Sequence, residues 1–230
     1  VGPDGNIWFT DGAQRRIGKI TLQGAITEYI PQPEEGSPDS IVAGPDGNLW
    51  FSNFQDAIGK VTTAGKFTLY TLAQYTSPTG VVAGADGTLW FTERNHGKIG
   101  RLSSAGAFDP SFALQDDALM PSHITLGPDG NVWFTEEAGW VGKITPACVP
   151  TEYPMPKGSM PYYITAGPDN AMWVSLINAD QVARVSLTGT VEVFDPPTAD
   201  TDPYGITTGP DGNIWFCEAK ASKVARLKLK

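Results

Sequence analysis

Short apolar segments alternate with glycine-rich turns along this chain, and the pattern recurs six times. Each repeat contains a Gly-Pro-Asp-Gly turn or a close variant of it. A strand that contains Trp-Phe or a similar apolar pair follows, and the next strand contains Gly, or another small residue, before a basic residue. The turns begin at Gly2, Gly44, Gly84, Gly127, Gly167 and Gly209, with spacings of 42, 40, 43, 40 and 42 residues. A period of about 40 residues is typical of repeat proteins, whose units bury their apolar faces against their neighbours.

The fourth repeat shows which elements one unit contains. Residues 121–127 predict a first strand, and the turn at 128–130 leads into a second strand at 131–136. Residues 140–144 predict a third strand, and a fourth strand includes 151–153. The second strand carries apolar side chains on both alternating sides, which indicates burial on both faces.

Four short antiparallel strands per repeat predict an all-β fold, a β-propeller with six blades, in a single domain over residues 1–230. The first repeat lacks its first strand except for Val1, and the sixth ends at Lys230 after its third strand. We therefore expect the terminal strands to close the ring. The alternative is a seven-bladed propeller from which an N-terminal portion has been lost.

The amino-acid composition limits the kinds of partner that the protein is expected to bind. The 230 residues are 40% hydrophobic and 18% charged, and 16 basic against 25 acidic residues give a net charge of −9. This acidic field argues against nucleic-acid and anionic-membrane binding, and no apolar run reaches the roughly 18 residues of a membrane helix. We expect a soluble monomer with no secretory signal at Val1 and with its compartment undetermined. Cys148 and Cys217 do not form a metal-type pair, and Cys217 is expected to be a buried free thiol inside a strand.

The repeated motif resembles a known family. Gly-Pro-Asp-Gly-Asn-(Ile/Leu/Val)-Trp-Phe-Thr-(Asp/Glu), then (Ile/Val)-Gly-(Lys/Arg)-(Ile/Val/Leu), then Ile-Thr-Glu-Tyr is similar to the repeats of the streptogramin B lyase (virginiamycin B lyase) family, and the resemblance covers the whole chain. It implies a propeller, seven-bladed in the family, that opens a cyclic depsipeptide antibiotic. In that reaction Mg²⁺ polarises the ester while a histidine base removes an α-proton, so the C–O bond breaks by elimination.

The chain departs from the family pattern at the catalytic motif. The family has a Glu two residues before its catalytic His, and this sequence has no Glu-x-His. Pro121 stands two residues before His123, and Tyr163 stands one repeat onward, where a second histidine would fall. A non-catalytic propeller that binds a peptide or glycan therefore stays open beside the carbon–oxygen lyase.

Candidate site residues follow from strand geometry, because the start of a first strand lies beside the end of its antiparallel second strand. These positions and the adjoining loops would meet at the central mouth of the ring. The predicted base is His123, since histidine transfers protons near neutral pH. The predicted ligands of Mg²⁺ are Glu136, Glu137 and Glu93, as hard cations prefer carboxylate oxygens. The predicted substrate-binding residues are Tyr162, Tyr163, Tyr204, Ser122, His96, Asp39, Asn53 and Trp140.

Each candidate also has a structural interpretation. His123 fits an ordinary rim histidine beside solvated acids as well as a base beside a metal ligand. The three tyrosines fit rim packing as well as an aromatic wall for a ring-shaped or sugar ligand. A hydrolase built on Ser122 and His123 is disfavoured, because adjacent residues on a strand point to opposite sides.

Overall fold

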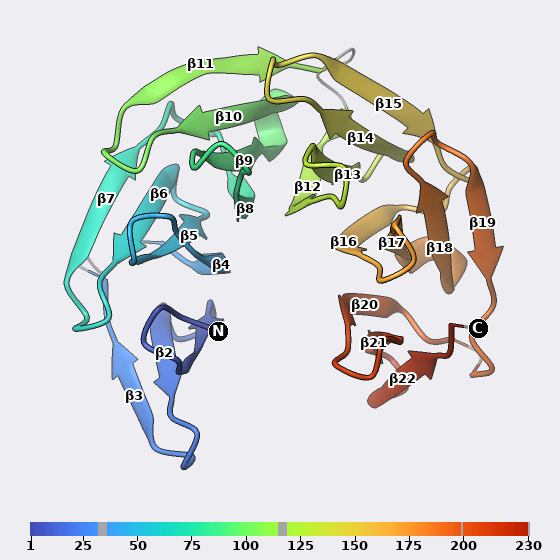
Figure 1. The fold of residues 1–230 in the computed structure, drawn as a ribbon, viewed down its shortest axis with the longest axis horizontal. Helices are drawn as coiled ribbons and strands as arrows, with labels where there is room; N and C mark the ends of the chain where they lie inside the picture. The colour runs from blue at the N-terminus through green and yellow to red at the C-terminus, as the bar shows by residue number, and fades with distance from the viewer. Residues whose placement is uncertain (32–35, 115–118, 199, 230) are drawn as a thin grey trace. The chain divides into compact units, whose positions relative to one another are not determined.

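The protein consists of small antiparallel sheets, seen here in a computed structural model (Figure 1). The structure describes residues 1–31, 36–114, 119–198 and 200–229, with only the backbone of 110–113. Two compact units, Val1–Asp117 and Ala118–Lys230, are each described on their own. The described part contains two single-turn 3₁₀ helices, η1 at Arg94–His96 and η3 at Ile177–Ala179. No helix in these ranges is long and apolar enough to cross a membrane.

The first unit holds three sheets whose strands follow one another in chain order. Its strands are β1 Ile7–Asp11, β2 Arg16–Ile20 and β3 Ile26–Tyr29; β4 Pro38–Ala43, β5 Leu49–Asn53, β6 Ala57–Val61 and β7 Phe67–Thr71; and β8 Pro78–Ala83, β9 Leu89–Glu93, β10 Lys98–Leu102 and β11 Phe108–Ala113. The first sheet has three strands and the other two have four.

The second unit repeats this plan with two four-stranded sheets and one three-stranded sheet. Its strands are β12 Pro121–Leu126, β13 Val132–Glu136, β14 Trp140–Ile144 and β15 Pro150–Pro154; β16 Pro161–Ala166, β17 Ala171–Leu176, β18 Gln181–Ser186 and β19 Val191–Phe194; and β20 Pro203–Thr208, β21 Ile214–Glu218 and β22 Lys223–Leu227. The prediction of an all-β propeller with six blades is confirmed, with three or four strands per blade.

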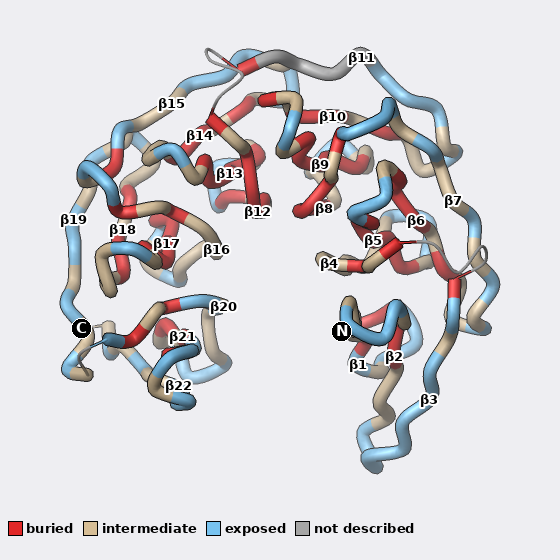
Figure 2. Tube along the Cα trace, turned by 180° about the vertical axis from the view of Figure 1, so that it is seen from behind, coloured by how far each residue is buried: buried red, intermediate tan, exposed pale blue. Residues whose placement is uncertain are grey.

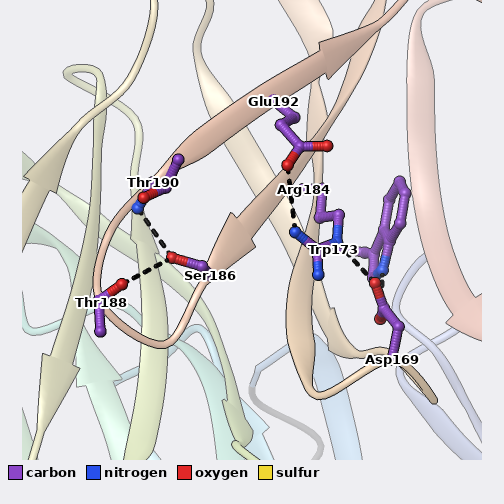
Figure 3. A network of polar contacts seen from close by, with 7 residues as sticks. All are labelled: Asp169, Trp173, Arg184, Ser186, Thr188, Thr190 and Glu192. Atoms are coloured by element: carbon purple, nitrogen blue, oxygen red, sulfur yellow. Dashed lines mark hydrogen bonds and ion pairs between the residues drawn. The ribbon is translucent and has the colours of Figure 1, made fainter.

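The Gly-Pro-Asp-Gly turn is held by a network that recurs from sheet to sheet. In the fifth sheet the Asp169 carboxylate accepts a hydrogen bond from Trp173 Nε1 at 3.1 Å and one from Arg184 Nε at 2.6 Å (Figure 3). Burial alone would raise the pKa of Asp169, but these two partners lower it. The equivalent sets are Asp4–Trp8–Lys19, Asp46–Trp50–Lys60, Asp129–Trp133–Lys143 and Asp211–Trp215–Arg226. These aspartates therefore serve the fold.

Within each unit the apolar core lies between consecutive sheets. Trp173 of the fifth sheet packs with Ile206, Ile214 and Phe216 of the sixth. Every residue of β5, β9, β13 and β17 is buried, whereas the outer strands are largely exposed (Figure 2). Burial of the second strands on both faces is therefore confirmed. The third-strand glycine makes this packing possible, because a Cβ at Gly142 would lie 2.1 Å from the Phe134 ring.

One expectation for the sixth sheet is wrong, because Cys217 is an exposed free thiol rather than a buried one. In the same sheet Trp215 is only half-buried, while the other five repeat tryptophans are buried. In the fourth sheet the residue equivalent to Cys217 is Thr135, whose Oγ1 donates to the Tyr162 carbonyl of the following sheet. In the described residues no following first strand covers Trp215 and Cys217, which line an open pocket of about 340 Å³.

Candidate functional site

Four aromatic rings meet at the first-strand starts of the second unit. The His123 ring, from β12, lies 3.6 Å from that of Tyr163 and 4.9 Å from that of Tyr162, measured between centroids. Tyr204, from β20, lies 5.1 Å from Tyr162 and 5.0 Å from Tyr163. We call these four residues the aromatic cluster. The structure thus brings together the predicted base and the three predicted tyrosines, from three consecutive sheets.

The backbone explains why two neighbouring side chains of one strand reach the same place. The pairing of β12 with β13 shifts register between Pro121 and Ile124, and β16 and β20 carry the same irregularity. A bulge of this kind re-aims side chains that strict alternation would separate. Ser122 Oγ consequently lies 3.1 Å from His123 Nδ1, so the expectation that these two side chains point to opposite sides is wrong.

His123 sits deep in the cluster and is 7% exposed. Burial lowers the pKa of its imidazole to about 3, although a hydrogen bond with the Tyr162 backbone partly opposes the shift. Its backbone N–H donates to Thr135 Oγ1 at 3.1 Å. The imidazole is therefore neutral at physiological pH and is a weak base. It packs against the tilted ring of Tyr163 and lies within hydrogen-bond distance of Ser122 Oγ.

The tyrosines have an exposed side and an acidic neighbour. Tyr204 is 40% exposed, and Tyr162 and Tyr163 are half-buried. Burial raises the pKa of Tyr162, and a hydrogen bond with Tyr204 and the charge of Glu137 raise it further. The Tyr162 phenol therefore stays protonated and can donate a hydrogen bond, and Glu137 is the predicted metal ligand whose charge acts on this cluster.

Glu136 is the acid that the sequence predicts as a metal ligand beside His123. Its side chain is fully buried at the end of β13, and neither carboxylate oxygen has a hydrogen-bond partner. Burial raises the pKa of this carboxyl to about 8, and the charge of Glu152 adds to the shift. Glu136 is thus protonated at neutral pH and makes no hydrogen bond to the imidazole.

The residues present do not fit a protein-built metal site. Within the described ranges no group of three or more His, Cys, Asp or Glu side chains converges as metal ligands. Mg²⁺ in proteins is typically bound by one or two carboxylates plus waters. Glu137 is a half-buried carboxylate whose charge acts on Tyr162, and it is therefore a carboxylate near the cluster. Trp140, on β14, makes no ring contact with the cluster among the described residues.

The remaining predicted site residues belong to the first unit. Glu93 ends β9 in a buried position, and its Oε2 lies 3.7 Å from Nδ1 of His96. Asn53 is buried at the end of β5, where its Oδ1 accepts from the Gln55 N–H at 3.2 Å. Burial raises the pKa of Asp39, near the start of β4, to about 6. Of these four side chains only that of His96 carries a ring, so the first-unit candidates do not form an aromatic cluster like that of the second unit.

Sequence reasoning missed two buried hydroxyls. Ser159 and Thr201 each lie two residues before a strand-opening proline, at Pro161 and Pro203, and their side-chain oxygens have no hydrogen-bond partner. Their recurrence at the same repeat position is the signal that would have identified them, since Thr76 stands two residues before Pro78.

Comparison with known proteins decides the family. The model of the virginiamycin B lyase family matches residues 1–136 and 76–230, which together span the whole chain. The chain belongs to the virginiamycin B lyase family. A comparison with curated protein sequences gives no match.

Solved structures of virginiamycin B and streptogramin B lyases are similar to this chain along nearly its whole length. A selenomethionine-substituted virginiamycin B lyase from Staphylococcus aureus is 34% identical, with a TM-score of 0.93 over 100% of this chain and 80% of that one. A streptogramin B lyase is 32% identical, with a TM-score of 0.89 over 99% of this chain and 80% of that one. A catalytically inactive histidine-to-alanine variant of the S. aureus enzyme with quinupristin is 34% identical, with a TM-score of 0.94 over 99% and 79%.

Proposed function

We propose that this protein binds a cyclic depsipeptide of the streptogramin B class on the aromatic cluster. The observation that carries the proposal is the convergence of His123, Tyr162, Tyr163 and Tyr204 from three consecutive sheets. The inactive relative whose structure includes quinupristin supports the ligand class, because this chain matches it along 99% of its length.

The physical case rests on what tyrosine offers a large ring-shaped ligand. Each ring provides flat apolar area with few rotatable bonds, and each phenol provides a hydrogen-bond donor at its tip. Tyr204 is the most exposed member, while His123 lies beneath the others and supports them. A ligand laid on this surface would therefore contact Tyr204 first and would be oriented by the phenols.

Binding of quinupristin, measured by isothermal titration calorimetry, tests the proposal. We expect Tyr204→Ala to weaken binding by about tenfold or more, because truncated aromatic anchors cost at least about 1–2 kcal/mol. Tyr75→Ala is the matched control, since Tyr75 is 78% exposed and belongs to the first unit. Equal losses in both variants, or no binding by the unmodified protein, would contradict the proposal.

A peptide or a glycan is the alternative ligand for the same surface. Both present groups that stack on or hydrogen-bond to tyrosine, so the cluster does not by itself discriminate between them. Titrating oligosaccharides and short peptides against the same two tyrosine variants would separate these ligand classes from the depsipeptide.

A carbon–oxygen lyase activity is the second candidate function, favoured by membership of the family. In this chain His123 would take the α-proton, and Tyr162 and Tyr204 would orient the ligand. The low pKa of His123 opposes strong base catalysis. The described residues form no group of three or more ligands that would hold Mg²⁺, so the roles assigned here are those of the side chains alone.

Liquid chromatography with mass spectrometry tests the lyase. Elimination opens the ring without a change in mass, so a linear product would elute separately while weighing the same as quinupristin. Loss of this product in His123→Ala would assign the base, and comparison of Mg²⁺ with a chelator would test the metal requirement. Gain of one water would indicate hydrolysis instead, and an unchanged antibiotic that still binds would leave the binding function alone.

A further inference from the structure

A separate pocket of about 370 Å³ lies between the fifth and sixth sheets of the second unit. Its walls are mainly apolar and are formed by β18 and the chain after β19 on one side and by β21 and β22 on the other. We call it the β22 pocket, after the residues Val182, Phe194, Pro197, Phe216, Glu218 and Val224 that line it. None of the four residues of the aromatic cluster lines it, and its volume suits a small organic ligand.

Glu218 is the acidic group of this pocket. The side chain lines the pocket and is 2% exposed, and its Oε1 has no hydrogen-bond partner. A buried carboxylate oxygen without a partner is unfavourable, because it has lost its hydration without gaining a donor. A ligand that brings a donor with positive charge would remove this cost.

The third sheet shows how the chain satisfies the same position internally. Glu93 ends β9 as Glu218 ends β21, and it lines a pocket of about 360 Å³ with His96. His96 Nδ1 lies 3.7 Å from Glu93 Oε2. The residue three positions after Glu218 is Ala221, whose methyl side chain supplies no polar partner. The sixth sheet therefore keeps the carboxylate of this position and lacks the neighbouring imidazole.

The other charged groups of the β22 pocket do not replace that imidazole. Arg226 is directed to Asp211, with 3.3 Å between Nη1 and Oδ2, and Asp195 accepts from Gln181 Nε2 at 2.7 Å. Lys223 is the register partner of Glu218 on β22, yet no ion pair joins the two in the described residues. Lys223 is thus the cation of the protein itself that would compete with a cationic ligand for Glu218.

We propose that the β22 pocket binds a small organic cation, an amidinium, guanidinium or primary ammonium group carried on an apolar body. The cationic head would donate hydrogen bonds to Glu218, and the apolar body would contact Phe194, Phe216 and Val224. A charge-assisted hydrogen bond inside a partly desolvated pocket gives such a head its selectivity over a neutral isostere.

Benzamidine and its neutral analogue benzamide test this proposal, because the two have nearly the same shape and differ in charge. Titration calorimetry with the full chain should show benzamidine binding about tenfold or more tightly than benzamide. Nuclear Overhauser contacts from bound benzamidine should reach the Phe194 and Phe216 rings. Equal affinities for the two compounds, or contacts confined to other aromatic residues, would overturn the proposal.

Three variants place the effect on the carboxylate. Glu218→Gln should abolish the preference for benzamidine, whereas Glu192→Gln, an exposed acid on β19, removes the same charge and should leave the preference intact. Lys223→Met removes the internal cation and should tighten benzamidine binding. If Glu218→Gln does not fold, the Lys223→Met titration and the ring contacts decide. A preference that survives in folded Glu218→Gln, or benzamidine binding unchanged in Lys223→Met, would overturn the assignment.

Discussion

The pKa values of carboxyl groups at the two ends of the fourth sheet shift in opposite directions. At the turn end, Asp129 is surrounded by donors from Trp133, Asn131 and Lys143, which lower its pKa although burial alone would raise it. At the other end, Glu136 is buried without any partner, and burial raises its pKa to about 8. Both belong to the fourth sheet, so the difference lies in local donors.

This contrast separates positions that serve the fold from positions that are free for a ligand. The turn aspartates hold a tryptophan and a basic side chain in nearly every repeat, which fixes their identity. The residues at the first-strand starts do not hold a repeated network of this kind. Their identities vary from Asp39 through Ser122 and His123 to the tyrosines. Unsatisfied or exposed groups accordingly gather at the varied end.

Removing the turn-end tryptophan should have the largest effect on stability. Trp133 is fully buried and packs with residues of the next sheet, so Trp133→Ala should lower the free energy of unfolding by about 3–5 kcal/mol. Urea denaturation measures this. Trp140→Ala, at a half-buried position seven residues later, should cost much less. Equal losses would show that the turn-end network is not what stabilises the sheet.

Neutralising the buried acid should have the next largest effect, with the opposite sign. The folded pKa of Glu136, about 8, lies above the usual 4.5, so the native state binds the extra proton between these values. Stability should therefore fall as pH rises from about 4.5 to 8. Glu136→Gln should remove this loss and stabilise the protein at pH 9 by on the order of a few kcal/mol. Identical melting profiles from pH 5 to pH 9 in both proteins would contradict a buried, unpartnered carboxyl.

The turn aspartate should show a smaller effect at acid pH. The folded pKa of Asp129 is lowered, so its contribution is present above the unfolded value near 3.8 and is lost as pH falls through the folded value. Asp129→Asn should cost about 1 kcal/mol at pH 7, since the carboxylate is partly solvated and its ion pair is screened. Thermal melts at pH 7 and pH 3 measure the difference, which should shrink at pH 3. A difference that grows at pH 3 would argue against the lowered pKa.

Much of this arrangement is readable in the sequence because strand and turn rules are local. The turn aspartates, the doubly buried Trp-Phe strands and the gathering of Tyr162, Tyr163 and Tyr204 at one strand end all follow from periodicity. The environment of Glu136 does not, because its missing partners depend on side-chain directions that periodicity leaves open. The contact between Ser122 and His123 depends on a bulge, and the exposure of Trp215 depends on what covers its sheet.

Nuclear magnetic resonance during a quinupristin titration tests the central claim most directly. We predict that the ring signals of Tyr162, Tyr163, Tyr204 and His123 shift. The indole N–H signals of Trp133 and Trp173, held by turn aspartates, should stay in place. Shifts centred on those indoles with the tyrosine signals unmoved would contradict a ligand site at the varied end of the blades.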